Sequence, residues 1–346
     1  MFGRFLLPAG FASVVLALLP FGCASSAKKP VLITSTSVSS PTATPTPTCL
    51  AACEAYVTHR YANYLSVIRL PNSAVVASIV VGNAPRGVAF SPNGSFAYVS
   101  NQLSASLSVI QTASRAVIAT VTTGNTPIGV AASPNGSFVY VVSDNANAVS
   151  IVSAASYAVV ATVSVGAFPQ GVCFSPNGSL AFVTNFGPDS MSVVDTSSLS
   201  VVATVFVSLG PIGIAATPNG SLVYVTGGGC GSDTVTVISV PAYTVLATLI
   251  VGTNPHAVAI SPNGSFAYVA NEFSGDLSVV NTATQVINAT VIVGFSPWGV
   301  AIPPNGSYVY VAAENSGDVC VVSAASNTVA TSIAMPSPPR GIAIRP

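Results

Sequence analysis

The sequence predicts an all-β protein, a seven-bladed β-propeller with four antiparallel strands in each blade. Three observations support this prediction. One motif recurs at a near-constant spacing, each recurrence contains four short apolar runs, and the last recurrence stops after its first run. Repeats of about 40–45 residues with four strands each are typical of propeller blades.

The recurring motif is Pro-x-Gly, in which x varies and one copy has Ala in place of Gly. It begins at Pro85, Pro127, Pro169, Pro211, Pro255, Pro297 and Pro339. Successive copies are 42 residues apart, except for 44 residues between the fourth and the fifth. The two extra residues fall in the loop 227–233, and repeat architectures tolerate insertions that are confined to loops.

Each repeat contains four apolar runs, which we name strands A to D. In the first complete repeat they cover 87–91, 96–100, 106–111 and 116–121. The pair Asn93-Gly94 lies between strands A and B, and both residues accept the positive φ of a tight hairpin turn. The runs lack a clean polar–apolar alternation because both faces of a blade are expected to pack on neighbouring blades.

The two ends of the repeat region complete each other. The C-terminal residues 339–346 match strand A of a blade and then stop, whereas residues 54–80 match strands B, C and D. We therefore expect the C-terminal strand to pair with the N-terminal strands in one composite blade. This pairing closes the ring and removes its open ends.

The N-terminal segment 1–22 has the pattern of an export signal, with Arg4, an apolar stretch and then small residues. A transmembrane anchor is the alternative. Cys23 follows Gly22 directly, as in a bacterial lipoprotein signal, so we predict its lipidation; cleavage after Ala24 to a secreted form is the other outcome. The prediction is an extracytoplasmic protein, lipid-anchored in the cell envelope or secreted, that contacts a membrane only through its anchor.

Residues 23–53 form a linker rich in Ser, Thr and Pro, which precedes the propeller at 54–346. Cys49 and Cys53 lie at its end, and in an oxidising compartment they are candidates for a small disulfide.

The charge balance limits the class of partner. Nine Lys and Arg side chains balance nine Asp and Glu side chains, and only 5% of the residues are charged. Nucleic-acid binding requires a basic face, so we exclude nucleic acid as a partner. The few ionisable groups gather in the B–C loops and at position x of Pro-x-Gly. Both places lie on the face of a propeller that carries the D–A and B–C connections, which we call the mouth.

The x residues predict a ligand site at the mouth. In ring order they are Arg86, Ile128, Gln170, Ile212, His256, Trp298 and Arg340. We expect Arg86, His256, Trp298 and Arg340, with His59 and Arg60 from a B–C loop, to bind a small anionic or sugar-like ligand. An aromatic ring beside guanidinium groups offers stacking and bidentate hydrogen bonds. The alternative is that charges collect there only because loops are polar.

Catalytic and metal-binding signals are weaker. His256, Glu272 and Glu314 are the catalytic candidates, because they fall on the same side of the ring. The same three residues could share a divalent cation, but they lack a fixed metal-ligand spacing, so the prediction is no metal and no cofactor. No G-x-S-x-G nucleophile motif occurs.

The repeats resemble a known family. AYVSN, FVTN, YVAN and YVTG end strand B, and VSVVDT, LSVVNT and LSVIQT follow in strand C. This pattern, over residues 54–346, is similar to the YVTN-type β-propeller repeat of bacterial extracytoplasmic and archaeal surface-layer proteins. The resemblance implies a seven-bladed fold and an envelope or surface location, but no single activity. Related propellers include lactonases and a streptogramin lyase, whose distinctive catalytic motifs are absent; the uncharged PNGS turn also departs from the family.

These observations favour a non-enzymatic binding scaffold of the cell envelope. Its mouth would bind an envelope protein, a glycan or a small anionic ligand. A lactonase- or lyase-like propeller enzyme with its site at the mouth is the alternative, and a surface-layer or adhesive structural protein is the third hypothesis. The predicted outer strands 158–165 and 244–251 carry no charge. Since exposed edges usually carry charges that discourage pairing, lateral self-association is also expected.

Overall fold

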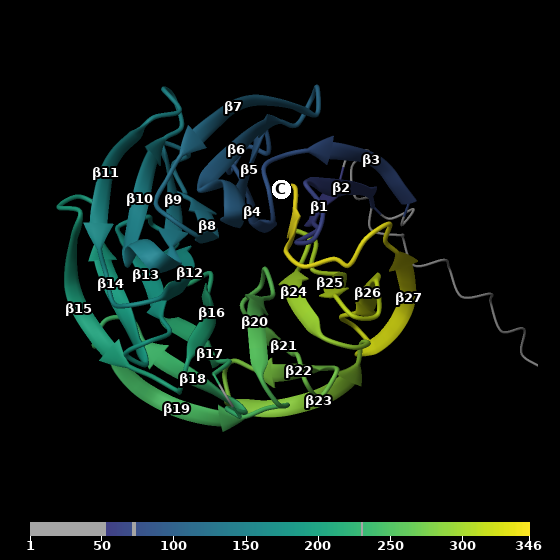
Figure 1. Cartoon of the computed structure of the whole chain (residues 1–346). Coiled ribbons are helices and arrows are strands. Elements are labelled where there is room, and N and C mark those ends of the chain that lie inside the picture. Colours follow the sequence, from purple (N-terminus) through teal and green to yellow (C-terminus); the bar gives the residue numbers. More distant parts are fainter. Residues whose placement is uncertain (1–52, 71–73, 230) are drawn as a thin grey trace, which may run out of the picture. The chain divides into compact units, whose positions relative to one another are not determined.

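The computed structural model describes residues 53–70, 74–229 and 231–346. They form seven four-stranded sheets, each strand antiparallel to its neighbours. The sheets follow one another around a ring, with strands such as β8 and β20 near its centre and β15 and β19 at its outer edge (Figure 1). The prediction of a seven-bladed β-propeller is therefore confirmed.

The first four blades have the following strands. Blade 1 contains β28 (Ile342–Ile344), β1 (Glu54–Thr58), β2 (Tyr64–Arg69) and β3 (Ala74–Val80). Blade 2 contains β4 (Pro85–Phe90), β5 (Phe96–Asn101), β6 (Ser106–Gln111) and β7 (Ala116–Thr122). Blade 3 contains β8 (Pro127–Ala132), β9 (Phe138–Ser143), β10 (Ala148–Ser153) and β11 (Val159–Ser164). Blade 4 contains β12 (Pro169–Phe174), β13 (Leu180–Asn185), β14 (Ser190–Asp195) and β15 (Ser200–Phe206).

The other three blades repeat this arrangement. Blade 5 contains β16 (Pro211–Ala216), β17 (Leu222–Gly227), β18 (Thr234–Ser239) and β19 (Thr244–Ile250). Blade 6 contains β20 (Pro255–Ile260), β21 (Phe266–Asn271), β22 (Asp276–Asn281) and β23 (Val286–Ile292). Blade 7 contains β24 (Pro297–Ala301), β25 (Tyr308–Ala313), β26 (Asp318–Ser323) and β27 (Thr328–Ala334). Two short 3-10 helices, η1 (Gln102–Ser104) and η2 (Asp144–Ala146), lie in B–C loops.

The hydrophobic core lies between neighbouring blades. The second and third strands of each blade are almost wholly buried, and their side chains pack against the next sheet. Between blades 1 and 2, for example, Tyr56, Val67 and Val99 are fully buried in one cluster. This two-sided burial explains why the apolar runs show no simple alternation.

The glycine of Pro-x-Gly is required by a close approach of neighbouring blades. A Cβ atom added to Gly129 would lie 2.4 Å from the carbonyl oxygen of Gln170, the x residue of the next blade. The same carbonyl position often accepts a hydrogen bond from a hydroxyl at the end of strand B. Thr184 donates to the Ile212 carbonyl at 2.9 Å, and Thr58 donates to the Arg86 carbonyl at 2.7 Å.

The ring closes in blade 1 as predicted. Strand β28 pairs antiparallel with β1, with Ala55 opposite Ile344 and Val57 opposite Ile342. The Arg340 amide donates to the Thr58 carbonyl at 2.9 Å, which extends the pairing toward the mouth. The two ends of the described chain are thus joined by backbone hydrogen bonds within one sheet.

The predictions for the N-terminal region lie outside the described residues. They comprise the export signal 1–22, lipidation of Cys23 and most of the linker 23–53. Cys53 is disulfide-bonded; because Cys49 lies outside the described residues, the Cys49–Cys53 pairing stays a prediction. Among the described residues, no helix is long and apolar enough to cross a membrane.

The outer strands expose apolar side chains. Val160 on β11 is 54% exposed and Leu246 on β19 is 58% exposed. Lateral self-association through these strands stays a prediction.

Deleting residues 339–346 should abolish cooperative folding, because it removes β28 and leaves β1 without its partner. Thermal unfolding followed by circular dichroism, together with sedimentation, would show an unfolded or aggregated chain. A truncated chain that keeps the full-length melting temperature would contradict closure through β28.

Replacing Gly129 with Ala should destabilise the propeller by about 3 kcal/mol, because the new methyl group overlaps the Gln170 carbonyl and the backbones must move apart. Urea denaturation would measure the change. Ala257 occupies the equivalent position in blade 6, so Ala257→Gly is the matched control and should change stability by about 1 kcal/mol or less. Equal effects of the two substitutions would argue against the close approach as the reason for glycine.

Candidate functional site

A cavity of about 360 Å³ lies at the mouth. Its lining comes from the x residues and from the adjoining D–A and B–C loops. These residues are Arg60, Arg86, Asp144, Phe168, Gln170, Phe186, Ile212, His256, Trp298 and Arg340. Six of the seven x residues belong to this lining. They do so because Pro-x-Gly lies at the start of strand A, which is the end of the strand at the mouth.

Trp298 is the aromatic centre of this site. The His256 ring lies against it, with ring centroids 3.5 Å apart and an angle of 50° between the planes. The Arg340 guanidinium carbon lies 3.3 Å from the Trp298 ring centroid, and the Arg86 guanidinium carbon lies 5.6 Å from it. An indole ring attracts cations over its face, so Trp298 helps to hold two guanidinium groups near one another.

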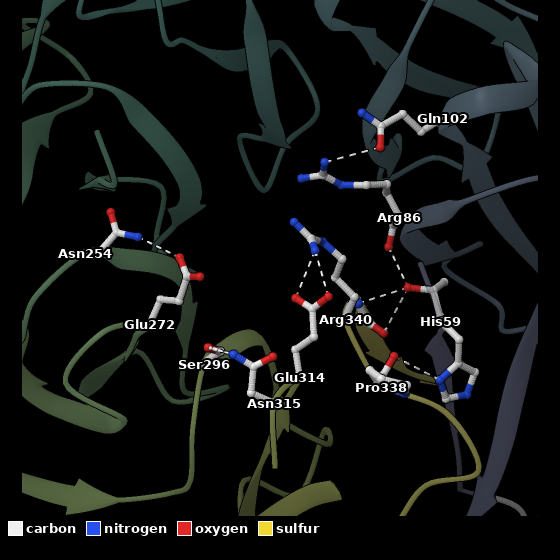
Figure 2. A network of polar contacts seen from close by, with 12 residues as sticks. His59, Arg86, Gln102, Asn254, Glu272, Ser296, Glu314, Asn315, Pro338 and Arg340 are labelled. Carbon is white, nitrogen blue, oxygen red and sulfur yellow. Dashed lines mark hydrogen bonds and ion pairs between the residues drawn. The ribbon is translucent and has the colours of Figure 1, made fainter. Parts of the chain in front are cut away.

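Glu314 fixes the position of Arg340. The Arg340 Nη1 atom donates to both carboxylate oxygens of Glu314, at 3.0 and 2.9 Å (Figure 2). The two side chains are only 5% and 7% exposed. The pair is therefore desolvated, and each charge depends on the other. Among the described residues, the buried Nε atom of Arg340 has no hydrogen-bond partner.

The site has a surplus of positive charge. Burial, and then repulsion from Arg340 and Arg60, lower the pKa of Arg86 to about 9. Burial also lowers the pKa of Arg340, to about 10, although Glu314 opposes this shift. Burial and the two arginines hold the pKa of His256 well below its usual value, so its imidazole is neutral at neutral pH. A bound anion would relieve the repulsion between the guanidinium groups.

On the side of the cavity opposite Trp298, the lining contains one carboxylate, that of Asp144. Asp144 begins η2, and its Oδ1 atom accepts a hydrogen bond of 3.1 Å from Gln170 Nε2. Burial raises the pKa of Asp144, and the positive charge of Arg86 acts in the opposite direction. Asp144 is therefore a half-buried carboxylate with a defined orientation, facing the same cavity as the arginines.

The predicted site residues fall into two groups. Arg60, Arg86, His256, Trp298 and Arg340 line the cavity, whereas the other three predicted residues are not part of its lining.

The three residues outside the lining have other partners. His59 is fully buried, and its ring bonds to Ser66 Oγ at 2.8 Å and to the Pro338 carbonyl at 3.3 Å. Glu272 accepts a hydrogen bond of 2.6 Å from Asn254, and both oxygens of Glu314 bond to Arg340. Within the described ranges, no three His, Cys, Asp or Glu residues are arranged to hold a metal ion, so His256, Glu272 and Glu314 do not form such a group.

Five lining residues are not among the predicted site residues: Asp144, Phe168, Gln170, Phe186 and Ile212. Asp144 could have been found, because it opens a B–C loop of the blade that precedes Gln170. Phe168 gave no such signal. It stands before Pro169 with a φ of 52°, a left-handed conformation that recurs before Pro-x-Gly in other blades, as at Ala84 and Thr126; the conformation thus belongs to the repeat, and nothing in the sequence distinguishes Phe168 as a lining residue.

Comparison with known proteins supports the fold and part of the family resemblance. The family model described as "Lactonase, 7-bladed beta-propeller" matches residues 68–198, which include Arg86, Asp144 and Gln170. No curated protein sequence matches the chain. The YVTN-type repeat family is not confirmed.

Three solved structures share the fold. Hydrazine synthase from Kuenenia stuttgartiensis is 20% identical, with a TM-score of 0.70, over 76% of this chain and 90% of that chain. A functionally unknown protein from Desulfotomaculum acetoxidans DSM 771 is 17% identical, with a TM-score of 0.73, over 84% and 98%. A protein provisionally named a 6-phosphogluconolactonase, from Bacteroides uniformis ATCC 8492, is 18% identical, with a TM-score of 0.73, over 85% and 100%. At these identities the similarity shows the fold alone. The chain is thus a seven-bladed β-propeller, part of which is similar to the lactonase family of that fold.

Replacing Glu314 with Gln should destabilise the protein by about 3–5 kcal/mol, because Arg340 would remain buried without its counter-ion. Urea denaturation at neutral pH would measure this loss. Glu272→Gln is the matched control, since Glu272 interacts with two neutral donors, Asn254 and Trp298, rather than with a buried charge. The amide oxygen of Gln can still accept a hydrogen bond, so the cost should be about 1 kcal/mol. A small effect at Glu314 would contradict the dependence of the buried arginine on this carboxylate.

Proposed function

We propose that the mouth cavity binds a small anionic sugar lactone and hydrolyses it. The observation that carries this proposal is the surplus of positive charge around Trp298. The positive charge of Arg340 lowers the pKa of Arg86, both arginines lower the pKa of His256, and Glu314 is the only carboxylate that forms an ion pair with either arginine among the described residues. A phosphate or carboxylate group placed between the guanidinium groups would accept charge-assisted hydrogen bonds from both.

The size and lining of the cavity suit such a ligand. A volume of about 360 Å³ is near the lower end of the range for small-molecule sites. Trp298, Phe168 and Phe186 provide apolar surface for a ring, and Arg86, Asp144 and Gln170 provide the polar contacts. The lactonase family match over 68–198 and the provisional name of one structural relative support a lactone as the ligand class. A phosphorylated lactone such as 6-phosphogluconolactone combines a ring with an anionic group.

In the proposed reaction, Asp144 and the cationic residues on the other side of the cavity have different roles. Asp144 accepts a proton from a water molecule as the water oxygen bonds to the lactone carbonyl carbon, and a carboxylate with a raised pKa is suited to this role. Arg86 and Arg340 hold the anionic group of the ligand, and the net positive charge of the cavity stabilises the negative charge that develops on the carbonyl oxygen. The ring C–O bond then breaks, and the proton passes from Asp144 to the leaving oxygen. The product is an open-chain hydroxy acid.

The other hypotheses are less well supported. The comparisons favour the lactonase alternative over the binding scaffold, and they do not support a surface-layer protein. Export and lipid anchoring remain proposals about the location of the protein, an envelope partner at the mouth remains a proposal about binding, and the YVTN assignment remains a proposal about the family.

Purified protein should hydrolyse 6-phosphogluconolactone, and the unphosphorylated gluconolactone less well, as measured by acid release at constant pH. Asp144→Asn should lower kcat by about 100-fold or more, because it removes the general base. Arg86→Gln should raise KM by about 10- to 100-fold, because it removes a charged donor to the anionic group.

Asp195→Asn is the matched control, since this carboxylate ends β14 at the C–D turn on the opposite face and accepts hydrogen bonds from Ser197 and Ser198. Its kinetics should equal those of the unsubstituted protein. Rates equal to the spontaneous hydrolysis of both lactones would reject the lactonase function.

A further inference from the structure

Two large grooves lie on the face opposite the mouth, where the A–B and C–D turns meet. One, of about 550 Å³, lies between blades 2 and 3, and the other, of about 680 Å³, lies between blades 6 and 7. Their lining residues are equivalent in the repeat. Neither groove shares a lining residue with the mouth cavity.

The first shared feature is an alanine at the C–D turn. In three other blades this position is threonine, and the hydroxyl donates to the carbonyl oxygen of the glycine in the A–B turn. The bonds are Thr112 to Gly94 at 2.8 Å, Thr196 to Gly178 at 2.8 Å and Thr282 to Gly264 at 2.5 Å. Blades 3 and 7 have Ala154 and Ala324 instead. Alanine has no hydroxyl to make this bond, and its smaller side chain leaves space that belongs to the groove.

The second shared feature is a pair of aromatic side chains, one from each blade. Phe96 and Phe138 line one groove, and Phe266 and Tyr308 line the other. Phe138 is 40% exposed and Tyr308 is 36% exposed, so each offers part of its ring to a ligand. At the equivalent positions blades 4 and 5 have Leu180 and Leu222, so the interfaces among blades 3 to 6 lack the pair. The alanine and the aromatic pair thus coincide at the same two interfaces.

The remaining lining combines Asn and Ser with Pro, Gly, Ala and one Tyr in each groove, and it carries no charged group. In the first groove the side-chain oxygens of Asn93 and Asn135 accept hydrogen bonds from Ser95 and Ser137 within their own turns, at 3.0 Å each. Their amide nitrogens remain as donors for a ligand. Asn263 and Asn305 have the same arrangement in the second groove. No Asp, Glu, Lys, Arg or His lines either groove.

We propose that these two grooves are binding sites for a neutral oligosaccharide, one chain in each groove. The apolar faces of sugar rings would lie against Phe138 and Tyr308, and sugar hydroxyls would bond to the asparagine amides and serine hydroxyls. An uncharged ligand fits because a charged group would lose its hydration there without gaining a partner. Carbohydrate is favoured over a proline-rich peptide because asparagine and serine line both walls of each groove, whereas grooves for such peptides are chiefly aromatic.

The test is isothermal titration of the full chain with three neutral tetrasaccharides: maltotetraose, cellotetraose and N-acetylchitotetraose. At least one should bind with two sites per chain. Ala154→Thr and Phe138→Leu introduce the residues that other blades carry at these positions, so the fold should tolerate both. Together they should remove one of the two sites, and adding Ala324→Thr and Tyr308→Leu should weaken the remaining binding at least about tenfold.

Arg86→Gln, at the mouth, should leave saccharide binding unchanged, so this test and that of the lactonase function fail separately. Equal melting temperatures would show that the variants are folded. The proposal is overturned if none of the three tetrasaccharides binds, if the groove variants bind as well as the unsubstituted protein, or if only a proline-rich peptide binds in the grooves.

Discussion

The structure depends on one recurring contact, in which the backbone carbonyl of an x residue approaches the strand-A glycine of the preceding blade; it occurs at six of the seven interfaces, and Ala257 replaces the glycine at the seventh. At Gly341 this contact joins the last copy of the motif to the first, since an added Cβ atom would lie 2.2 Å from the Arg86 carbonyl. At these glycines the approach leaves no room for a side chain, and hydroxyls such as that of Thr184 donate hydrogen bonds to the carbonyls. Closure of the ring and the choice of glycine therefore have the same cause.

The same contact determines the site. Because the backbone of Pro-x-Gly is held by neighbouring blades, six of the seven x side chains line the mouth cavity although they differ in charge, polarity and size. The chemistry of the cavity can then differ between blades without disturbing the fold. This chain places Arg86, His256, Trp298 and Arg340 at adjacent positions, and Gln170 stands across from them. The B–C loops provide the carboxylates that bond to two of these side chains: Glu314 accepts hydrogen bonds from Arg340, and Asp144 accepts one from Gln170.

The repeat made the fold and the composite blade predictable, because spacing and turn residues fix the order of strands without knowledge of packing. It also identified the arc of x residues. It did not show that Glu314 is bound to Arg340, or that Glu272 is bound to Asn254, because such pairs join different segments and depend on side-chain geometry. His59 could not be separated from Arg60, its neighbour in sequence, although one is buried beside Ser66 and the other lines the cavity.

Departures from the repeat are therefore more informative about function than the repeat itself. Most positions of a blade are fixed by backbone pairing and by packing between sheets, so a change there has a cost in stability. Where a position faces an inter-blade groove, or lines the mouth without a buried ion-pair partner, a change costs little stability and instead alters what the surface can bind. Ala154 and Ala324 replace a threonine that bonds within the blade, and each such replacement coincides with an exposed aromatic ring nearby. In a chain with so few charges, ligand binding outside the cationic mouth depends chiefly on aromatic rings and on neutral polar groups such as asparagine amides and serine hydroxyls.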